Sequence, residues 1–213
     1  MKREKRLERI FSEEIKTDLE KQYNKNISNS IHSELKNEFL VVFKNLGGIE
    51  EHYNYRGRVD LVFNNMVIEL DEQLHFNRYR INTLESSLYD LLPKFPHQEY
   101  LNYCRSYESE CLKSGKHGGR WSNSSCDRMF GKANSEGKLD QNGSSRWKQR
   151  AFNDFVKDAS YLITNIPVVR LSIYQNILID DRSYSLGEAL QNEGIPDEIL
   201  KKEIELLIND QIL

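Results

Sequence analysis

The sequence predicts an α/β fold in which helices flank a mixed β-sheet. Three observations predict it: apolar residues recur at helical spacing near both ends of the chain, residues 59–71 alternate like two short strands, and residues 167–173 form an apolar run of strand length. Helical and strand segments interleave, an order that is typical of a sheet covered by helices. We expect residues 1–213 to form one domain, because this length suits a single domain of ordinary size.

Composition and charge narrow the class of protein. Charged residues make up 30% of the sequence, and no segment approaches the roughly 20 consecutive apolar residues that span a bilayer. The basic N-terminus precedes no apolar run and so does not read as a secretory signal. We therefore expect a cytoplasmic protein with no membrane partner. Residues 112–150 contain nine Lys or Arg against three Asp or Glu, whereas residues 176–213 contain three against nine, so the first segment favours a polyanionic partner.

Four segments have the spacing of helices. Apolar residues recur every three or four positions in residues 4–23, and again in residues 31–46 up to the pair Gly47-Gly48. The other two segments are 146–161 and 185–213, of which the second has room for one or two helices. We expect these helices to cover the sheet.

Residues 59–71 predict a hairpin that turns at Asn64-Asn65, since Asn tolerates the positive φ of a tight turn. Glu69 and Asp71 share one face of their strand, and Asp60 on the preceding strand faces across to them. Three converging carboxylates repel one another unless a cation joins them, and hard oxygen ligands suit Mg²⁺ or Mn²⁺. The alternatives are a solvated sheet face or ion pairs with nearby arginines. These arginines are Arg56, Arg58, Arg78 and Arg80.

Residues 96–145 are rich in Gly, Ser and Asn and contain all three cysteines. We expect an irregular, basic insertion without a hydrophobic core of its own. Its cysteines and histidine have the Cys₃His composition of a structural Zn²⁺ site. The alternative interpretation is three ordinary reduced cysteines and a surface histidine. The ligand set would be Cys104, Cys111, His117 and Cys126. The basic residues around it, which would form a DNA-contacting arm, are Lys113, Lys116, Arg120 and Arg128.

The sequence motif around this hairpin resembles that of the PD-(D/E)XK, or restriction-endonuclease-like, nuclease superfamily. The motif consists of residues 58–63, the turn, and residues 67–76. Within this superfamily it is most similar to the branch related to the very-short-patch-repair endonuclease, where an Asp strand precedes Ile-Glu-x-Asp-Gly and a His. The superfamily's Lys, two residues after the Glu, is Asp71 here, a departure that this branch shares. The Gly expected next is Glu72, which puts the turn geometry in question. The insertion has no counterpart in the motif.

This resemblance implies a restriction-endonuclease-like sheet and a set of roles. Asp60 and Glu69 would hold the metal, and Asp71 would be a further ligand or would orient the water. His75 would transfer a proton, and Gln73 would align substrate or water. Many relatives also bring an acid to the site from the helix before the sheet. Here that acid would be Glu34 or Glu38, of which we favour Glu34.

The helix after the insertion would complete the site. Lys148 would supply the positive charge that the strand lacks, and residues beside it would contact phosphate. These residues are Arg146, Gln149 and Arg150. A surface helix carrying the same charges is the alternative. Arg170, among apolar neighbours, would contact phosphate or pair with a buried acid.

We therefore expect a metal-dependent endonuclease that hydrolyses phosphodiester bonds in nucleic acid, with double-stranded DNA as the expected substrate. Restriction, repair and defence all fit, as does a homodimer. One alternative is a non-catalytic nucleic-acid- or protein-binding module that retains the nuclease fold. Another is a zinc hydrolase or Cys-His enzyme built on the four soft ligands, which no open zinc position supports. An HNH-type nuclease fits the His and Asn spacings poorly.

Overall fold

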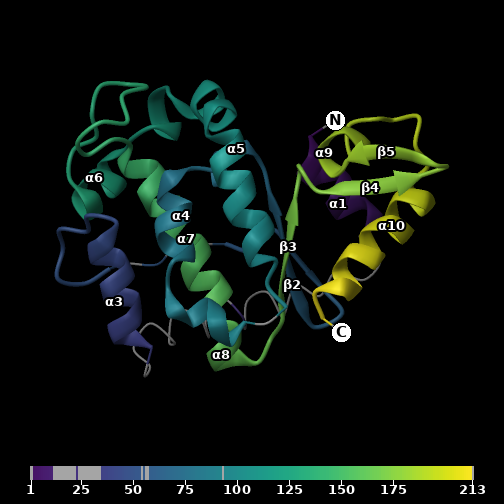
Figure 1. Ribbon diagram of the computed structural model, residues 1–213, viewed down its shortest axis with the longest axis horizontal. Helices are drawn as coiled ribbons and strands as arrows, with labels where there is room; N and C mark the ends of the chain where they lie inside the picture. Colours follow the sequence, from purple (N-terminus) through teal and green to yellow (C-terminus); the bar gives the residue numbers. More distant parts are fainter. Residues whose placement is uncertain are drawn as a thin grey trace.

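A three-stranded mixed sheet lies at the centre of the computed structural model, which describes residues 2–11, 23, 35–53, 55, 58–92 and 94–212 (Figure 1). The strand order is β1 (Leu61–Phe63), β2 (Met66–Asp71), β3 (Val168–Ser172). β1 is antiparallel to β2, and β3 is parallel to it. The predicted mixed sheet with flanking helices is confirmed.

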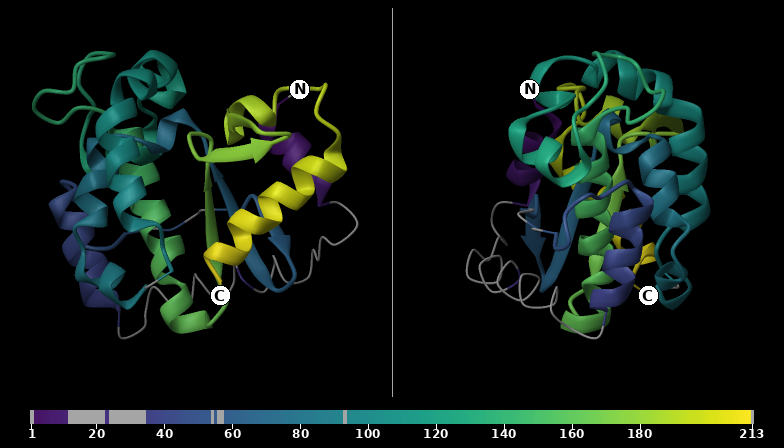
Figure 2. Two further views of the ribbon diagram at one scale, coloured as in Figure 1. Left: turned by 45° about the vertical axis from the view of Figure 1, so that its right-hand side comes forward. Right: turned by 90° about the vertical axis from the view of Figure 1, so that its left-hand side faces the viewer.

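Helices cover both sides of this sheet (Figures 1 and 2). On one side lie α3 (Lys36–Asn45), α4 (Arg78–Leu84), α5 (His97–Gly115), α6 (Ser124–Phe130), α7 (Ser145–Ala159) and α8 (Tyr161–Thr164), with the 3₁₀ turns η2 (Gln73–His75), η3 (Ser87–Leu91) and η4 (Gly118–Arg120). On the other side lie α1 (Arg3–Ile10), α9 (Leu186–Ala189), α10 (Asp197–Asp210) and a hairpin of β4 (Asn176–Ile179) and β5 (Arg182–Ser185). The basic segment thus lies on one side of the sheet and the acidic segment on the other. None of the helices within the described ranges has the length and apolar character to cross a bilayer.

The predicted helices are found wherever the structure describes them. α1 begins the segment 4–23, and α3 covers most of the segment 31–46; residues 12–22 and 24–34 lie outside the described residues. α7 matches the segment 146–161, and α9 and α10 match 185–213.

Two hairpins turn at a pair of residues that both have positive φ. In the predicted hairpin, Asn64 and Asn65 have φ of 45° and 62°, and the register Phe63↔Met66 leaves these two as the loop. The β4–β5 hairpin, which was not predicted, turns on Asp180 and Asp181 with φ of 46° and 61°. Asp also tolerates this conformation, so an Asp-Asp pair between short alternating runs was the signal.

The two faces of β2 differ in chemistry. Ile68 and Leu70 lie on an apolar face, which β3 continues and α10 covers. Glu69 and Asp71 lie on the opposite face, where the parallel register places Arg170 beside Glu69. Both acids are only 1% exposed, because α7 covers this face. The prediction that Glu69 and Asp71 share one face was correct. These acids and Arg170 form ion pairs with one another and with residues of α7, and we call this buried group the ionic layer.

The prediction of an irregular insertion at 96–145 was wrong. Most of this segment is helical: α5 alone runs for 19 residues, and the longest stretch with neither helix nor strand is residues 131–144. α5 buries Tyr100, Cys104, Cys111 and Gly115, a spacing of four, seven and four residues that follows one side of a helix. Cysteine counts as a small hydrophobe in such a pattern.

The predicted zinc set is not assembled. Cys104, Cys111 and Cys126 are buried, and burial raises the pKa of the first two thiols to about 12, which keeps them neutral. His117 is exposed, and its Nδ1 lies 2.8 Å from Glu136. Among the residues that the structure describes, the one group with metal-ligand spacing lies elsewhere and contains no cysteine. The cysteines are therefore core residues, and the positions of these four side chains do not support a zinc site.

We predict that the three thiols do not react with Ellman's reagent in the native protein, with or without EDTA. Buried, neutral thiols are poor nucleophiles, so all three should react only after unfolding in urea. The release of thionitrobenzoate, counted per chain, measures this. A native protein whose thiols become reactive on chelation would instead indicate a structural zinc.

Candidate active site

The polar face of α7 lines a cavity of about 650 Å³, which we call the main cavity. Its residues 146, 149, 150, 153, 154 and 157 recur every three or four positions, and all of them line this cavity, while Phe152 and Phe155 pack in the core. The basic side chains at the wall are Arg58, Arg128, Arg146, Arg150 and Lys157, against the acidic Glu50, Asp60 and Asp154. The excess of cations suits an anionic ligand.

Asp60 stands between this cavity and the buried face of the sheet. Its Oδ2 accepts a hydrogen bond of 2.9 Å from the backbone N–H of Leu70, and it lines the cavity. Extending the β1–β2 register by one residue places Asp60 opposite Glu69. Burial raises the pKa of Asp60, although Lys157 opposes the shift. The hairpin therefore brings together the first two predicted metal ligands.

Glu69 is buried with one oxygen satisfied and one without a partner. The ammonium of Lys157 donates to Oε2, whereas Oε1 has no hydrogen-bond partner. Burial raises the pKa of Glu69 to about 7; Lys157 lowers it and the nearby charge of Asp60 raises it. A buried carboxylate oxygen without a donor is unfavourable, and a cation would remove both this deficit and the repulsion between the acids.

The lysine of the site is Lys157, and the prediction of Lys148 was wrong. The ammonium of Lys148 donates to Asn142 Oδ1 at 2.6 Å and lies 5.6 Å from the centre of the Tyr79 ring. Nine residues of helix turn the chain through about 900°, which places Lys148 and Lys157 on opposite sides of α7. Only Lys157 faces the strand.

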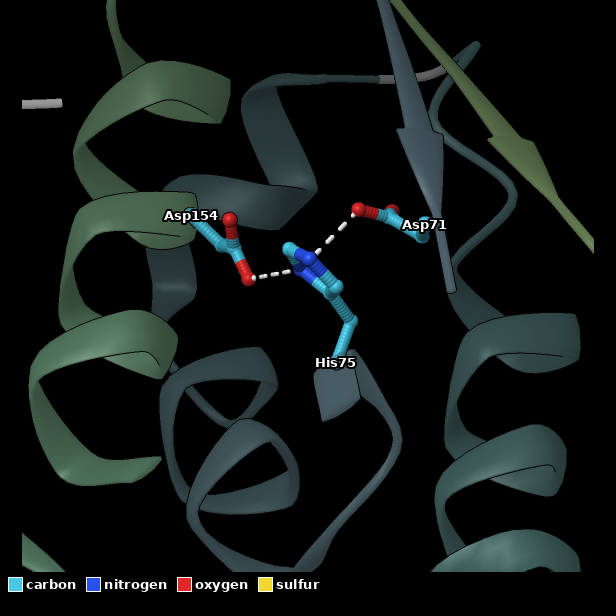
Figure 3. A group of neighbouring side chains, drawn as sticks. All are labelled: Asp71, His75 and Asp154. Atoms are coloured by element: carbon cyan, nitrogen blue, oxygen red, sulfur yellow. Dashed lines mark hydrogen bonds and ion pairs between the residues drawn. The ribbon is translucent and has the colours of Figure 1, made fainter. Parts of the chain in front are cut away.

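Asp71, His75 and Asp154 converge from β2, η2 and α7 (Figure 3). The Nδ1 of His75 lies 2.7 Å from Asp154 Oδ2 and 3.1 Å from Asp71 Oδ1. One ligand atom from each residue lies within 4.8 Å of the others, so the group could hold a metal ion. The same geometry fits an imidazole whose Nδ1–H is held by two carboxylates.

Arg170 connects this group to the rest of the ionic layer. Its guanidinium donates to Asp71 Oδ1 at 2.9 Å, to Asp158 Oδ1 at 2.8 Å and to the backbone carbonyl of Asp154 at 3.0 Å. The other oxygen of Asp71 accepts from the Tyr100 hydroxyl at 2.7 Å. Both oxygens of Asp71 are therefore engaged, and Arg170 is the partner of buried acids rather than a phosphate contact.

His75 combines an anchored nitrogen with access to solvent. Its Nε2 has no hydrogen-bond partner in the described part of the chain, its side chain is 21% exposed, and the ring lines the cavity. Burial lowers the pKa of His75, but Asp154 and Asp71 outweigh burial and raise it. This geometry fits the predicted role in proton transfer.

The raised pKa of His75 predicts a pH dependence of stability. The folded state holds the proton more tightly than the unfolded state, so this contribution is complete below the ordinary pKa of 6.5 and is lost as the pH rises through the raised value. The free energy of unfolding of wild type, minus that of His75→Gln, should fall between pH 6 and pH 9 in urea titrations. A difference that grows over this range would contradict the assignment.

Some of the other predicted site residues line the cavities, and the rest lie away from them. Arg128, Arg146, Gln149 and Arg150 line the main cavity. Gln73, Arg120 and Arg150 line an adjoining cavity of about 310 Å³ that shares Asp60 and His75 with the first. Lys113 and Lys116 line neither of these two, Glu38 is exposed on α3, and Glu34 lies outside the described residues.

Sequence reasoning missed Asp154, Lys157 and the acid Asp158 beneath them. The signal was present in α7: between residues 146 and 159 the polar positions follow one helical stripe and the apolar positions another. This polar stripe contains acids and a lysine as well as arginines, and its helix packs over the strand that carries Glu69 and Asp71. Together these features indicate that the helix and the strand contribute to one site.

The fold and the site define an α/β protein with a buried ionic layer that opens into a basic cavity. The chain belongs to the family described as "Family of unknown function (DUF7255)", whose model matches residues 41–192. This range contains β1, β2, β3, α7 and every residue of the Asp71–His75–Asp154 group. No curated protein and no solved structure matches the chain.

Proposed function

We propose that the protein is a divalent-metal-dependent nuclease, with Asp60 and Glu69 as the metal ligands and DNA as the substrate. The observation that carries the proposal is the buried Glu69 Oε1, which lacks a partner beside Asp60 at the edge of a cation-rich cavity. Resemblance of the hairpin to the restriction-endonuclease-like nucleases gives these two acids the same role.

The carboxylate pair fits Mg²⁺ or Mn²⁺. Such ions take oxygen ligands, keep several waters and are commonly bound by one or two carboxylates together with substrate phosphate. The pair offers hard oxygens only, and Lys157 leaves one oxygen of Glu69 unpaired. A bound cation would supply charge neutralisation at the phosphate and a water of lowered pKa.

The remaining residues have roles that follow from their contacts. Asp154 and Asp71 orient His75, so that Nε2 can exchange a proton with a group in the cavity. The side chain of Arg150 makes no hydrogen bond within the described chain, and it lines both cavities, so it is available to a phosphate oxygen. Asp71 acts here as an anchor of His75 and not as a metal ligand.

The test is a cleavage assay with supercoiled plasmid, single-stranded DNA and RNA, each with EDTA, Mg²⁺ or Mn²⁺. We expect metal-dependent conversion of plasmid to nicked or linear forms. No cleavage of any of the three substrates with either metal would refute the nuclease and leave a binding module. Cleavage of RNA alone would retain the chemistry and change the substrate.

A further inference from the structure

Asn153 lines the main cavity, and its side chain makes no hydrogen bond within the described chain. It lies one turn after Arg150 and one turn before Lys157, on the polar face of α7. Its Oδ1 is buried and has no partner, but the residue lines the cavity, so a rotation of the amide about its Cβ–Cγ bond would present this oxygen to a ligand there. An unsatisfied buried amide oxygen costs about 1–3 kcal/mol, so Asn at this position is explained best by a ligand.

The chemistry of the amide limits what that ligand can be. A phosphate oxygen only accepts hydrogen bonds, and the five cations of the cavity serve it. A carboxamide offers a donor and an acceptor side by side, and its acceptor needs an N–H or O–H group. Within a DNA strand, the sugar–phosphate backbone has no such donor, whereas base edges carry donors and acceptors in adjacent positions.

We propose that Asn153 binds the edge of a nucleobase in this cavity, while Arg150, one turn away, binds phosphate. Asn153 then selects for nucleic acid with an accessible base over binding to the backbone alone. This inference rests on nucleic acid being the ligand, as proposed above, but it requires no hydrolysis.

The test compares binding with and without bases. Fluorescence anisotropy in EDTA would measure the Kd of a labelled single-stranded DNA 12-mer and of the same strand with tetrahydrofuran abasic sites at its central positions. We expect wild type to bind the base-bearing strand more tightly. Asn153→Ala should weaken that binding roughly 10-fold and leave the Kd of the abasic strand unchanged. Arg150→Gln should weaken both.

Asn82→Ala, an exposed position on α4, is the matched control and should change neither Kd. Thermal melting checks that each variant is folded. The proposal is overturned if wild type binds neither strand, or if Asn153→Ala changes both Kd values equally or neither of them. A third probe is the same 12-mer made as RNA. The proposal is also overturned if Asn153→Ala weakens binding of this RNA alone, which would assign the amide to the 2′-hydroxyl. Base-dependent binding without any cleavage in Mg²⁺ would refute the proposed nuclease activity but support the role of Asn153 in base binding.

Discussion

Glu69→Gln and Asp60→Asn should each reduce metal-dependent DNA cleavage by about 10³-fold or more, since each removes a negative charge from a two-carboxylate metal site. Both substitutions are close to isosteric, so the hairpin and the cavity should persist. Initial rates of plasmid cleavage across a Mg²⁺ series measure the effect. For Asp60→Asn, part of the loss should be recoverable at high metal concentration, because Asp60 lines the cavity.

The control is Glu85→Gln, an exposed acid at the end of α4 that lines neither cavity. It should cleave at the wild-type rate. Near-wild-type cleavage by Glu69→Gln, with an unchanged melting temperature, would remove Glu69 from the site. The metal would then have to be sought at another group of acids.

Arg170→Met should lower the free energy of unfolding by about 3–5 kcal/mol, because three buried acids would lose their shared cation. Arg170 is 1% exposed and reaches Asp71, Asp154 and Asp158. Met preserves much of the volume, so the loss reports on charge rather than on a cavity. For a chain of this size, thermal unfolding should shift by roughly 10 °C.

Arg78→Met provides the comparison. Arg78 pairs with Glu108 at 2.8 Å, but its side chain is 48% exposed, and exposed pairs contribute about 0–1 kcal/mol. Equal losses for the two variants in urea titrations would contradict the view that the ionic layer depends on Arg170.

The hairpin could be predicted from sequence because its information is local. Asn64-Asn65 specifies the turn, and the two-residue period fixes which side chains share a face. The choice between Lys148 and Lys157 could not be made in this way. They lie on opposite sides of one helix, so the choice depends on which side packs against the sheet, a tertiary fact.

The cysteines misled for a related reason. Cys104 and Cys111 were read as ligands because they lie close to a histidine in a Gly- and Ser-rich segment. In the fold they occupy core positions of α5, beside Tyr100. The helical spacing was visible in the sequence, but it appears only when Cys is counted as apolar.

Two positions for a divalent ion therefore remain physically distinct. At Asp71, His75 and Asp154, Arg170 already bonds to the oxygen of Asp71 that faces His75, so a second cation would meet a guanidinium. At Asp60 and Glu69, Lys157 occupies only Oε2 of Glu69, the buried Oε1 lacks a partner, and the nearby charge of Asp60 raises the pKa of Glu69. The electrostatics favour the second position.

Anomalous diffraction from a crystal soaked in Mn²⁺ tests this claim most directly. We predict a single strong anomalous peak within coordination distance of Asp60 and of Glu69 Oε1, with His75 still held by its two carboxylates. A peak among Asp71, His75 and Asp154, or no peak at either place, would contradict the account.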